Sequence, residues 1–312
     1  MLSTLKKVAT PLLTSALYFV MATSAHATAF SDSLQYGNTA SMIGIGKIEG
    51  YTPHAGVLFE NTAALTQSKS GLSLFYLNAM DYSVNAITGA ISHHLSPGIT
   101  VGIGISRESS GSLDMTGEED DEAVSLETFE YTNTAYIAGL GVDISDILAL
   151  GATYTHYDKQ LYTVRGQGGA LGLSAHLDFK DTDIFLKAKN LGNHALRYNE
   201  GDDETLLAEY GLTLGQHISL SEDFSTTLMG QLKVSEGLPS LRNLGIRLYP
   251  FEKTLALGVG YQESRGIGDQ VYGGFTFGLD LTLADMTISY AYQTTQYVAQ
   301  DHEHHFSVFF GL

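Results

Sequence analysis

The chain has 312 residues, a formal net charge of −18 and no cysteine. The excess of acids argues against nucleic-acid binding, because phosphates require a basic surface, and the lack of cysteine excludes disulfides and thiol chemistry. Hydrophobic residues make up 44% of the chain, yet the mean hydropathy is only +0.02. That combination is typical of a membrane barrel, in which apolar residues occupy every second position.

The first 27 residues have the three parts of a secretion signal. Lys6 and Lys7 form a basic start, Val8 to Met21 form a mostly apolar stretch, and Ala25-His26-Ala27 resembles a cleavage site. The alternative, a retained membrane anchor, requires a longer apolar span. We therefore predict that residues 1–27 are a signal peptide, whose removal takes away two lysines and changes the net charge to −20.

Residues 28–70 do not have the pattern of strands. The stretch from Gly37 to Gly46 is rich in small residues, and Asn61-Thr62-Ala63-Ala64-Leu65 is typical of a short helical or turn element. The role of this segment depends on the strands that follow it.

Fourteen segments of alternating apolar and small or polar residues follow, most of them long enough to cross a bilayer at a tilt. The predicted strands are 71–80, 82–95, 99–109, 131–144, 147–161, 168–179, 182–190, 206–219, 223–236, 240–250, 254–265, 270–281, 284–297 and 301–312. Within the strand 240–250, for example, Leu244 and Ile246 share one face while Asn243 and Arg247 share the other. Each strand therefore has an apolar face and a face of small or polar residues.

A soluble β-sandwich has the same period, but the lengths of the connections favour a barrel. Very short connections are predicted at alternate positions: 96–98, 145–146, 180–181, 220–222, 251–253 and 282–283. The connections between them include the longer segments 110–130 and 191–205. Short turns at one end and long loops at the other are typical of outer-membrane barrels. We predict an all-β fold, a fourteen-stranded antiparallel transmembrane β-barrel over residues 71–312 in the cell outer membrane.

The barrel prediction has consequences for partners and for the segment that precedes the barrel. The outer face is expected to contact outer-membrane lipid, and the alternating strand from Phe306 to Leu312 is expected to be recognised by the barrel-assembly machinery. A barrel of this size has a lumen that a segment can fill, so we predict that residues 28–70 are an N-terminal plug. The sequence gives no indication of the oligomeric state.

Charged residues on the inner face of the predicted strands are candidates for a function in the lumen, because charge is costly against lipid. These residues are Lys187, Glu209, Lys233 and Arg247. Lys189 and Asp280 are less securely placed on this face. The charges could form structural pairs across the lumen or with the plug, or they could form a polar path for a cargo that carries a carboxylate.

Other polar clusters have simpler explanations. The acidic run 117–122 is expected to be a solvated loop rather than a cation site, and Gly166-Gln167-Gly168-Gly169 a flexible turn. The histidines at 93–94 and in 301–305 are expected to lie at strand ends rather than to bind a metal. The chain lacks the nucleophile and zinc-protease motifs of hydrolases. We predict no catalytic residues, no metal and no cofactor, although an outer-membrane hydrolase is a further alternative.

The order of several short motifs resembles the FadL-type transporters of hydrophobic compounds and their PorV/PorQ relatives. Asn61, Ala63 and Leu65 match an N-P-A-x-L element in which Thr62 replaces the proline. The stretch 189–192 resembles an N-L-G turn, and 289–292 with the terminal strand resembles the end of PorV/PorQ chains. The resemblance covers most of residues 37–312.

This resemblance implies one of two functions. FadL-type members pass fatty acids or aromatic hydrocarbons passively, with an N-terminal hatch and a lateral exit through the barrel wall. PorV-like members are non-transporting components of a protein secretion or surface-display system. The leading hypothesis is passive transport of small hydrophobic compounds, and the alternative is the secretion component.

Overall fold

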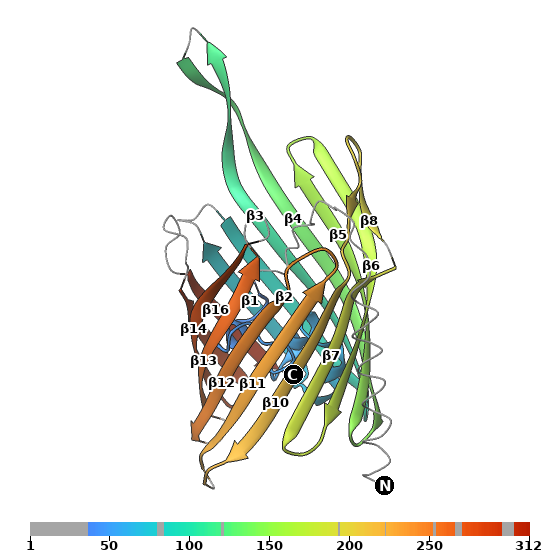
Figure 1. The fold of residues 1–312 in the computed structure, drawn as a ribbon, viewed down its shortest axis with the longest axis vertical. Coiled ribbons are helices and arrows are strands. Elements are labelled where there is room, and N and C mark those ends of the chain that lie inside the picture. The colour runs from blue at the N-terminus through green and yellow to red at the C-terminus, as the bar shows by residue number, and fades with distance from the viewer. Residues whose placement is uncertain are drawn as a thin grey trace.

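A computed structural model of the chain describes residues 37–79, 84–119, 122–192, 194–221, 223–251, 254–265, 270–294 and 303–312. These residues form a cylinder of tilted antiparallel strands with a short segment of chain inside it (Figure 1). The predicted signal peptide and residues 28–36 of the predicted plug lie outside the described residues.

Fourteen strands form the wall of the barrel. They are β1 (Gly71–Ala79), β2 (Val84–Ser96), β3 (Ile99–Glu119), β4 (Glu122–Ser145), β5 (Leu148–Leu161), β6 (Val164–Asp178), β7 (Thr182–Leu191), β10 (Glu209–Ser219), β11 (Ser225–Ser235), β12 (Leu241–Phe251), β13 (Leu255–Arg265), β14 (Val271–Leu283), β15 (Met286–Gln293) and β16 (Glu303–Gly311). Neighbours along the chain pair in turn, and β1 pairs with β16, with Gly71 opposite Gly311. The predicted closed fourteen-stranded antiparallel barrel is confirmed, and each predicted strand overlaps an observed one.

The two faces of the wall differ as the alternation predicts. On β12, Leu244 and Ile246 are 62% and 45% exposed, whereas Asn243 and Arg247 are each 3% exposed. Leucine, isoleucine, phenylalanine and tyrosine occupy outward positions on strands all around the ring. An apolar outer surface of this extent requires lipid around it, and closure leaves no strand edge unpaired in that lipid. The barrel therefore spans a membrane, and its fold is that of an outer-membrane protein.

The β3–β4 hairpin differs from the predicted loop at 110–130. The described residues of this range continue β3 to Glu119 and begin β4 at Glu122, so they form a two-stranded ribbon that projects beyond the ring (Figure 1). Leu113 lies opposite Phe129 in this ribbon. The prediction was wrong because the high density of acids masked a period-two pattern that supports a ladder of strand pairs.

A second correction concerns the glycines at 166–169, which belong to β6 and do not form a flexible turn. Gly166 pairs with Tyr198 of the short strand β8 (Ala195–Tyr198), which in turn pairs with β9 (Glu204–Thr205). A Cβ on Gly166 would lie 2.6 Å from Cζ of Tyr198. The glycine thus leaves room for the β8–β9 hairpin, which replaces the loop predicted at 191–205.

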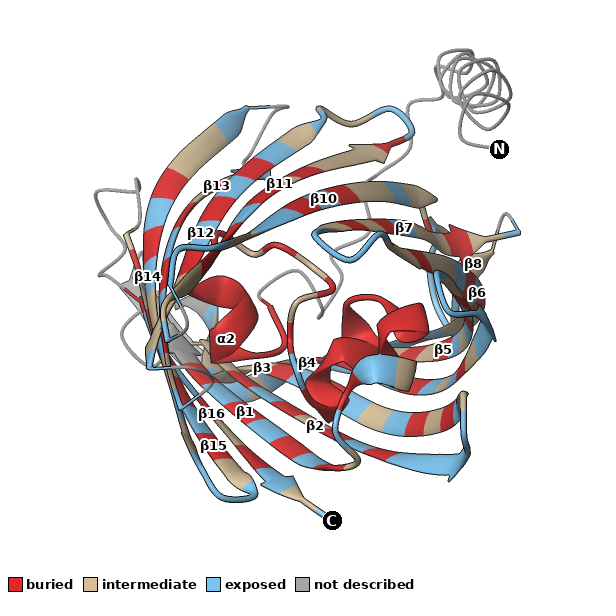
Figure 2. Cartoon of the chain, turned by 90° about the horizontal axis from the view of Figure 1, so that it is seen from below, coloured by how far each residue is buried: buried red, intermediate tan, exposed pale blue. Residues whose placement is uncertain are grey.

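Residues 37–70, which we call the plug segment, run inside the ring (Figure 2). They contain the α-helix α2 (Ala40–Ile43) and two 3-10 helices, η2 (Ala55–Phe59) and η3 (Thr62–Gln67). The short helical element predicted around residue 63 is thus confirmed. No helix in the described part of the chain is long and apolar enough to cross a membrane.

Candidate functional site in the barrel lumen

The plug segment lies directly on the backbone of β13 and β14, because inward positions of these strands are glycines. A Cβ on Gly278 would lie 2.7 Å from Cα of Gly44, and a Cβ on Gly258 would lie 2.7 Å from the Gly44 carbonyl oxygen. At Gly46, where φ is +83°, the N–H donates to Oγ1 of Thr276 over 2.9 Å. The small residues of the inner face therefore determine how closely the segment packs against the wall.

Apolar side chains anchor the plug segment at three further places, the smallest of which joins Ile45 and Ile48 to Met229 of β11. Leu58, Phe59 and Leu65 cluster with Ile137 of β4 and Phe185 of β7. A second cluster joins Met42 and Ile43 to Phe75 and Leu77 of β1 and to Ala291 of β15. Full burial of a leucine or phenylalanine side chain is worth about 1.5–3 kcal/mol. These clusters therefore supply much of the attraction between the segment and the wall.

The three motif residues of the plug prediction each contact the wall. The side-chain amide of Asn61 donates to the Leu186 carbonyl of β7 over 3.0 Å, and the N–H of Ala63 donates to Oγ of Ser174 on β6 over 2.9 Å. Leu65 is fully buried and lies against β3, where a Cβ on Gly102 would be 3.4 Å from its Cδ1. The structure therefore spreads the motif over three strands.

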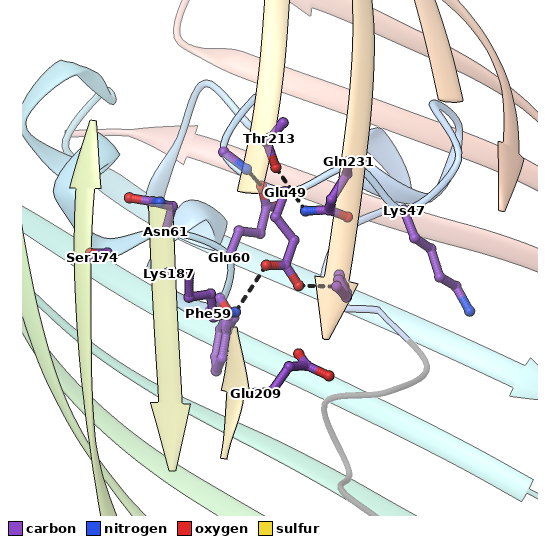
Figure 3. A network of polar contacts seen from close by, with 12 residues as sticks. Lys47, Glu49, Phe59, Glu60, Asn61, Ser174, Lys187, Glu209, Thr213 and Gln231 are labelled. Carbon is purple, nitrogen blue, oxygen red and sulfur yellow. Dashed lines mark hydrogen bonds and ion pairs between the residues drawn. The ribbon is translucent and has the colours of Figure 1, made fainter. Parts of the chain in front are cut away.

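Lys187 and Lys233 meet at one carboxylate of the plug segment, that of Glu49. Figure 3 shows Lys187 pointing toward Glu49. Nζ of Lys187 lies 3.1 Å from Oε2 of Glu49, and Nζ of Lys233 lies 2.6 Å from Oε1. Lys187 also donates to the Phe59 carbonyl over 3.0 Å. Burial opposes the ionisation of Glu49, but the two ammonium groups prevail and lower its pKa to about 2. Glu49 is therefore a carboxylate that joins the plug segment to β7 and β11.

Arg247 binds the plug segment at two separate points. Its Nη1 donates to the Tyr51 carbonyl over 2.9 Å, and its Nη2 donates to both the carbonyl and Oγ of Ser41 over 2.8 Å. Asp280 of β14 lies 3.6 Å from the same Nη2 and accepts a hydrogen bond of 3.0 Å from the Ser41 hydroxyl. The guanidinium fork thus holds residues 41 and 51 together against the wall.

Glu209 of β10 forms a separate group. Its Oε2 lies 3.6 Å from Nη1 of Arg265 on β13 and accepts a hydrogen bond of 3.4 Å from Ser235. In Figure 3 it lies beyond the pair formed by Glu49 and Lys187. Three of the four predicted lumen residues therefore contact the plug segment, and the fourth pairs with residues of the wall.

Glu60 is a buried carboxyl group that the sequence did not single out. It is 1% exposed and accepts hydrogen bonds from the Gly50 N–H over 3.0 Å and from the hydroxyls of Thr52 and Thr39. Burial outweighs these bonds and raises the pKa of Glu60 to about 7. One signal was present: Glu49 and Glu60 are the only acids between residues 37 and 70.

Three histidines of the two predicted clusters, 93–94 and 301–305, have contacts that the structure describes. His305 is fully buried and stacks on Phe75, whereas His304 is exposed and lies beside the Tyr290 hydroxyl. His94 contacts the Ser68 carbonyl, near the end of the plug segment. Within the described ranges, no group of three or more metal-binding side chains is close enough to hold an ion. Asp301, His302 and the acids at 120–121 lie outside the described residues.

One small cavity lies between the plug segment and the wall among the described residues. A cavity of about 20 Å³ lies beside Lys187, lined by Leu58, Phe59 and Glu60 of the plug segment and by Ile137 and other residues of β4–β7. A cavity needs about 10–15 Å³ to hold one water molecule. This space therefore accepts a water molecule but no hydrocarbon.

Several solved structures have a fold similar to that of this chain. The Pseudomonas putida toluene transporter TodX aligns with a TM-score of 0.57 at 13% identity, over 92% of this chain and 98% of TodX. The Ralstonia pickettii toluene transporter TbuX aligns with a TM-score of 0.54 at 12% identity, over 88% of this chain and 97% of TbuX. A Pseudomonas aeruginosa FadL homologue gives a TM-score of 0.56 at 10% identity, over 88% and 98%.

The chain has the FadL-type fold. The predicted resemblance to FadL-type barrels is confirmed at the level of structure, and the PorV/PorQ part stays a prediction. No family model matches the sequence, and no curated protein matches it either. TodX and TbuX are described as toluene transporters.

Proposed function

We propose that the chain is a passive channel for small hydrophobic compounds, such as fatty acids or aromatic hydrocarbons, in which residues 28–70 form the plug. The observation that carries this proposal is a closed barrel whose lumen is filled by one segment held only by non-covalent contacts. A structural filler needs no reversible attachment. A channel needs a segment that is attached reversibly, because its cargo must pass through the part of the lumen that the segment fills. The proteins of similar fold that are described as toluene transporters support this proposal.

Passage requires a rearrangement of the plug segment. The cavity beside Lys187 holds about one water molecule, and Glu49 and Arg247 attach the plug segment to the wall at other points. A molecule as large as toluene therefore crosses only when part of the plug segment leaves the wall. The contacts between the plug segment and the wall would then determine the rate of passage, and the hydrogen bonds between the strands of the barrel would not.

The test is flux through the purified barrel. Liposomes that contain the full-length processed protein should release a trapped or partitioned aromatic hydrocarbon faster than protein-free liposomes. A deletion strain should take up radiolabelled fatty acid or toluene more slowly than its parent. Normal uptake in the deletion strain together with no flux in liposomes would refute the proposal.

The projecting ribbon favours a second candidate function, the secretion component. Residues 110–130 contain eight acids and no basic residue, and their described part projects beyond the ring as strands β3 and β4 (Figure 1). Such a surface could hold an exported partner at the membrane. This candidate predicts that deletion of residues 110–130 removes proteins from the cell surface and leaves the uptake of hydrophobic compounds unchanged.

A further inference from the structure

The outer face of the barrel carries a row of polar residues near the end from which the ribbon projects. The strands β3, β4, β5, β6 and β8 lie side by side there (Figure 1). The residues just before or after the row, such as Ser106, Tyr157 and Leu196, are buried, so the row itself faces outward. In the order of these strands, the directly paired positions of the row are Arg107, Thr134, Asp158, Gln167 and Arg197.

Arg165 of β6 adds a third guanidinium group to this face. Its Nε and Nη2 donate to the two carboxylate oxygens of Asp158 over 2.9 Å and 2.5 Å. Nη2 of Arg107 lies 3.9 Å from Glu130, and Arg197 forms no ion pair with any residue that the structure describes. Both Arg107 and Arg165 are more than half exposed. Three guanidinium groups thus meet one close carboxylate and one distant carboxylate, and the face keeps a positive charge that is open to a ligand.

The outward residues between this row and the short turns are aromatic first and aliphatic next. Tyr136 of β4 and Tyr154 of β5 are 47% and 52% exposed, as is typical of the aromatic girdle at a membrane interface. Ile103, Leu140 and Leu150 follow toward the short turns and are exposed as well. The row therefore lies at the depth of lipid headgroups. It faces the outer leaflet, because short turns mark the periplasmic end of an outer-membrane barrel.

Arginines are scarce in this acidic chain, and this face concentrates them. The sequence has six arginines and a net charge of −18. Arg247 and Arg265 pair with Asp280 and Glu209. Three of the other four lie on this one face, and the fourth, Arg242, lies on β12, away from these strands. The planar fork of arginine matches the oxygens of a phosphate group better than the single point charge of lysine does.

We propose that Arg107, Arg165 and Arg197, which we call the arginine row, bind the phosphate groups of a lipid headgroup in the outer leaflet. Asp158 positions the Arg165 fork, and the guanidinium groups of Arg107 and Arg197 take the phosphate oxygens. The acyl chains of the same lipid would lie along the tyrosines and aliphatic residues toward the short turns. The surface fits a phosphorylated lipid whether or not the barrel carries a cargo, so this inference does not rest on the proposed function.

The experiment measures lipid binding to the full-length processed protein in detergent by native mass spectrometry. The probes are lipid A with two phosphate groups and the same lipid without phosphate, both in the presence of EDTA. We expect the wild-type protein to bind the phosphorylated form at least about tenfold more tightly. R107Q, R165Q and R197Q should each weaken this binding by about fivefold, the usual effect of one basic residue beside an anionic membrane surface. R242Q removes an outward arginine of β12 and is the matched control, which should bind as the wild-type protein does.

Four results would overturn the proposal. Equal binding of the two lipids by the wild-type protein would do so, and this comparison needs no variant. A preference for phosphate that appears only when Mg²⁺ replaces EDTA would assign the lipid to a cation held by acids such as Glu130. Loss of binding in R242Q equal to that in the row variants would show a general attraction of charge. Displacement of the lipid by an equal concentration of inorganic phosphate would show that the arginines bind free phosphate. Heat-modifiable migration on gels checks that each variant has folded.

Discussion

The substitution Arg247→Met should release the plug segment and leave the barrel intact. Arg247 makes hydrogen bonds of 2.9 Å and 2.8 Å to the carbonyls of Tyr51 and Ser41, and its side chain is 4% exposed. Hydrogen bonds to charged groups contribute about 1.5–3 kcal/mol each. Loss of the guanidinium also leaves Asp280 buried without its partner, and breaking a buried pair costs about 3–5 kcal/mol. These terms overlap, so we expect docking of the segment to weaken by about 3–5 kcal/mol.

Hydrogen exchange measures this loss directly. A change of about 3–5 kcal/mol corresponds to about two to four orders of magnitude in the opening equilibrium, since about 1.4 kcal/mol is tenfold. Peptides that cover residues 41–51 should therefore exchange that much faster in the variant, while peptides of β12 and its neighbours keep their protection. Arg165→Met is the matched control, because Arg165 pairs with Asp158 on the exposed part of the barrel.

Two results would contradict this reasoning. Unchanged exchange of residues 41–51 would mean that the apolar clusters hold the segment without Arg247. Loss of heat-modifiable migration on gels would mean that Arg247 stabilises the barrel itself.

Three further predictions concern the same segment. Gly278→Ala should displace Gly44 and raise flux through the barrel in liposomes, whereas Gly89→Ala, where the new Cβ would lie 3.5 Å from Leu74, should not; equal flux in the two variants would show that the close packing is unimportant. Burial raises the pKa of Glu60 to about 7 and lowers the pKa of His54 to about 3. For Glu60 the docked state binds more protons between its ordinary pKa of 4.5 and 7, so its contribution to docking is fully present below pH 4.5 and is lost as pH rises to 7. For His54 the undocked state binds more protons between pH 3 and 6.5, so docking weakens there as pH falls and offsets Glu60. Relative to Glu60→Gln, the wild-type protein should therefore lose about 3 kcal/mol of docking between pH 4.5 and 7 by hydrogen exchange; parallel pH profiles would contradict this. Leu65→Cys with Gly141→Cys, whose Cβ atoms would lie 3.5 Å apart, suits a disulfide; oxidation should stop flux and reduction restore it, and unaffected flux would show that η3 stays in place during passage.

The wall of the barrel could be predicted from the sequence because its signal is local. Outward Leu244 and inward Asn243 are neighbours in the chain, and each short turn joins two strands that are consecutive in the chain. The same local reasoning failed at 110–130, where the many acids masked the alternating pattern of two strands that pair Leu113 with Phe129. It failed again at Gly166, where the ring of Tyr198, which is distant in the sequence, leaves no room for a side chain.

The contacts in the lumen could be predicted only in part. The strand register indicated which charges face inward, but their partners are distant in the sequence: Glu49 lies 138 residues from Lys187 and 184 from Lys233. The backbone of residues 37–70 is mostly irregular, so no periodic pattern of apolar residues in the sequence predicts its course through the lumen. Glu60, whose partners all lie within the plug segment, had only one signal: it and Glu49 are the two acids between residues 37 and 70.

The pairing of β1 with β16 has a consequence for the order of assembly. This seam joins the first and last strands of the cylinder, and the Leu312 N–H donates to the Ser70 carbonyl over 3.1 Å where the plug segment enters β1. The barrel cannot close before β16 has paired with β1. After closure, the plug segment would have to enter a narrow lumen through one end of the barrel. We therefore expect residues 37–70 to enter while the sheet is still open, so that the last strand encloses a lumen that is already occupied.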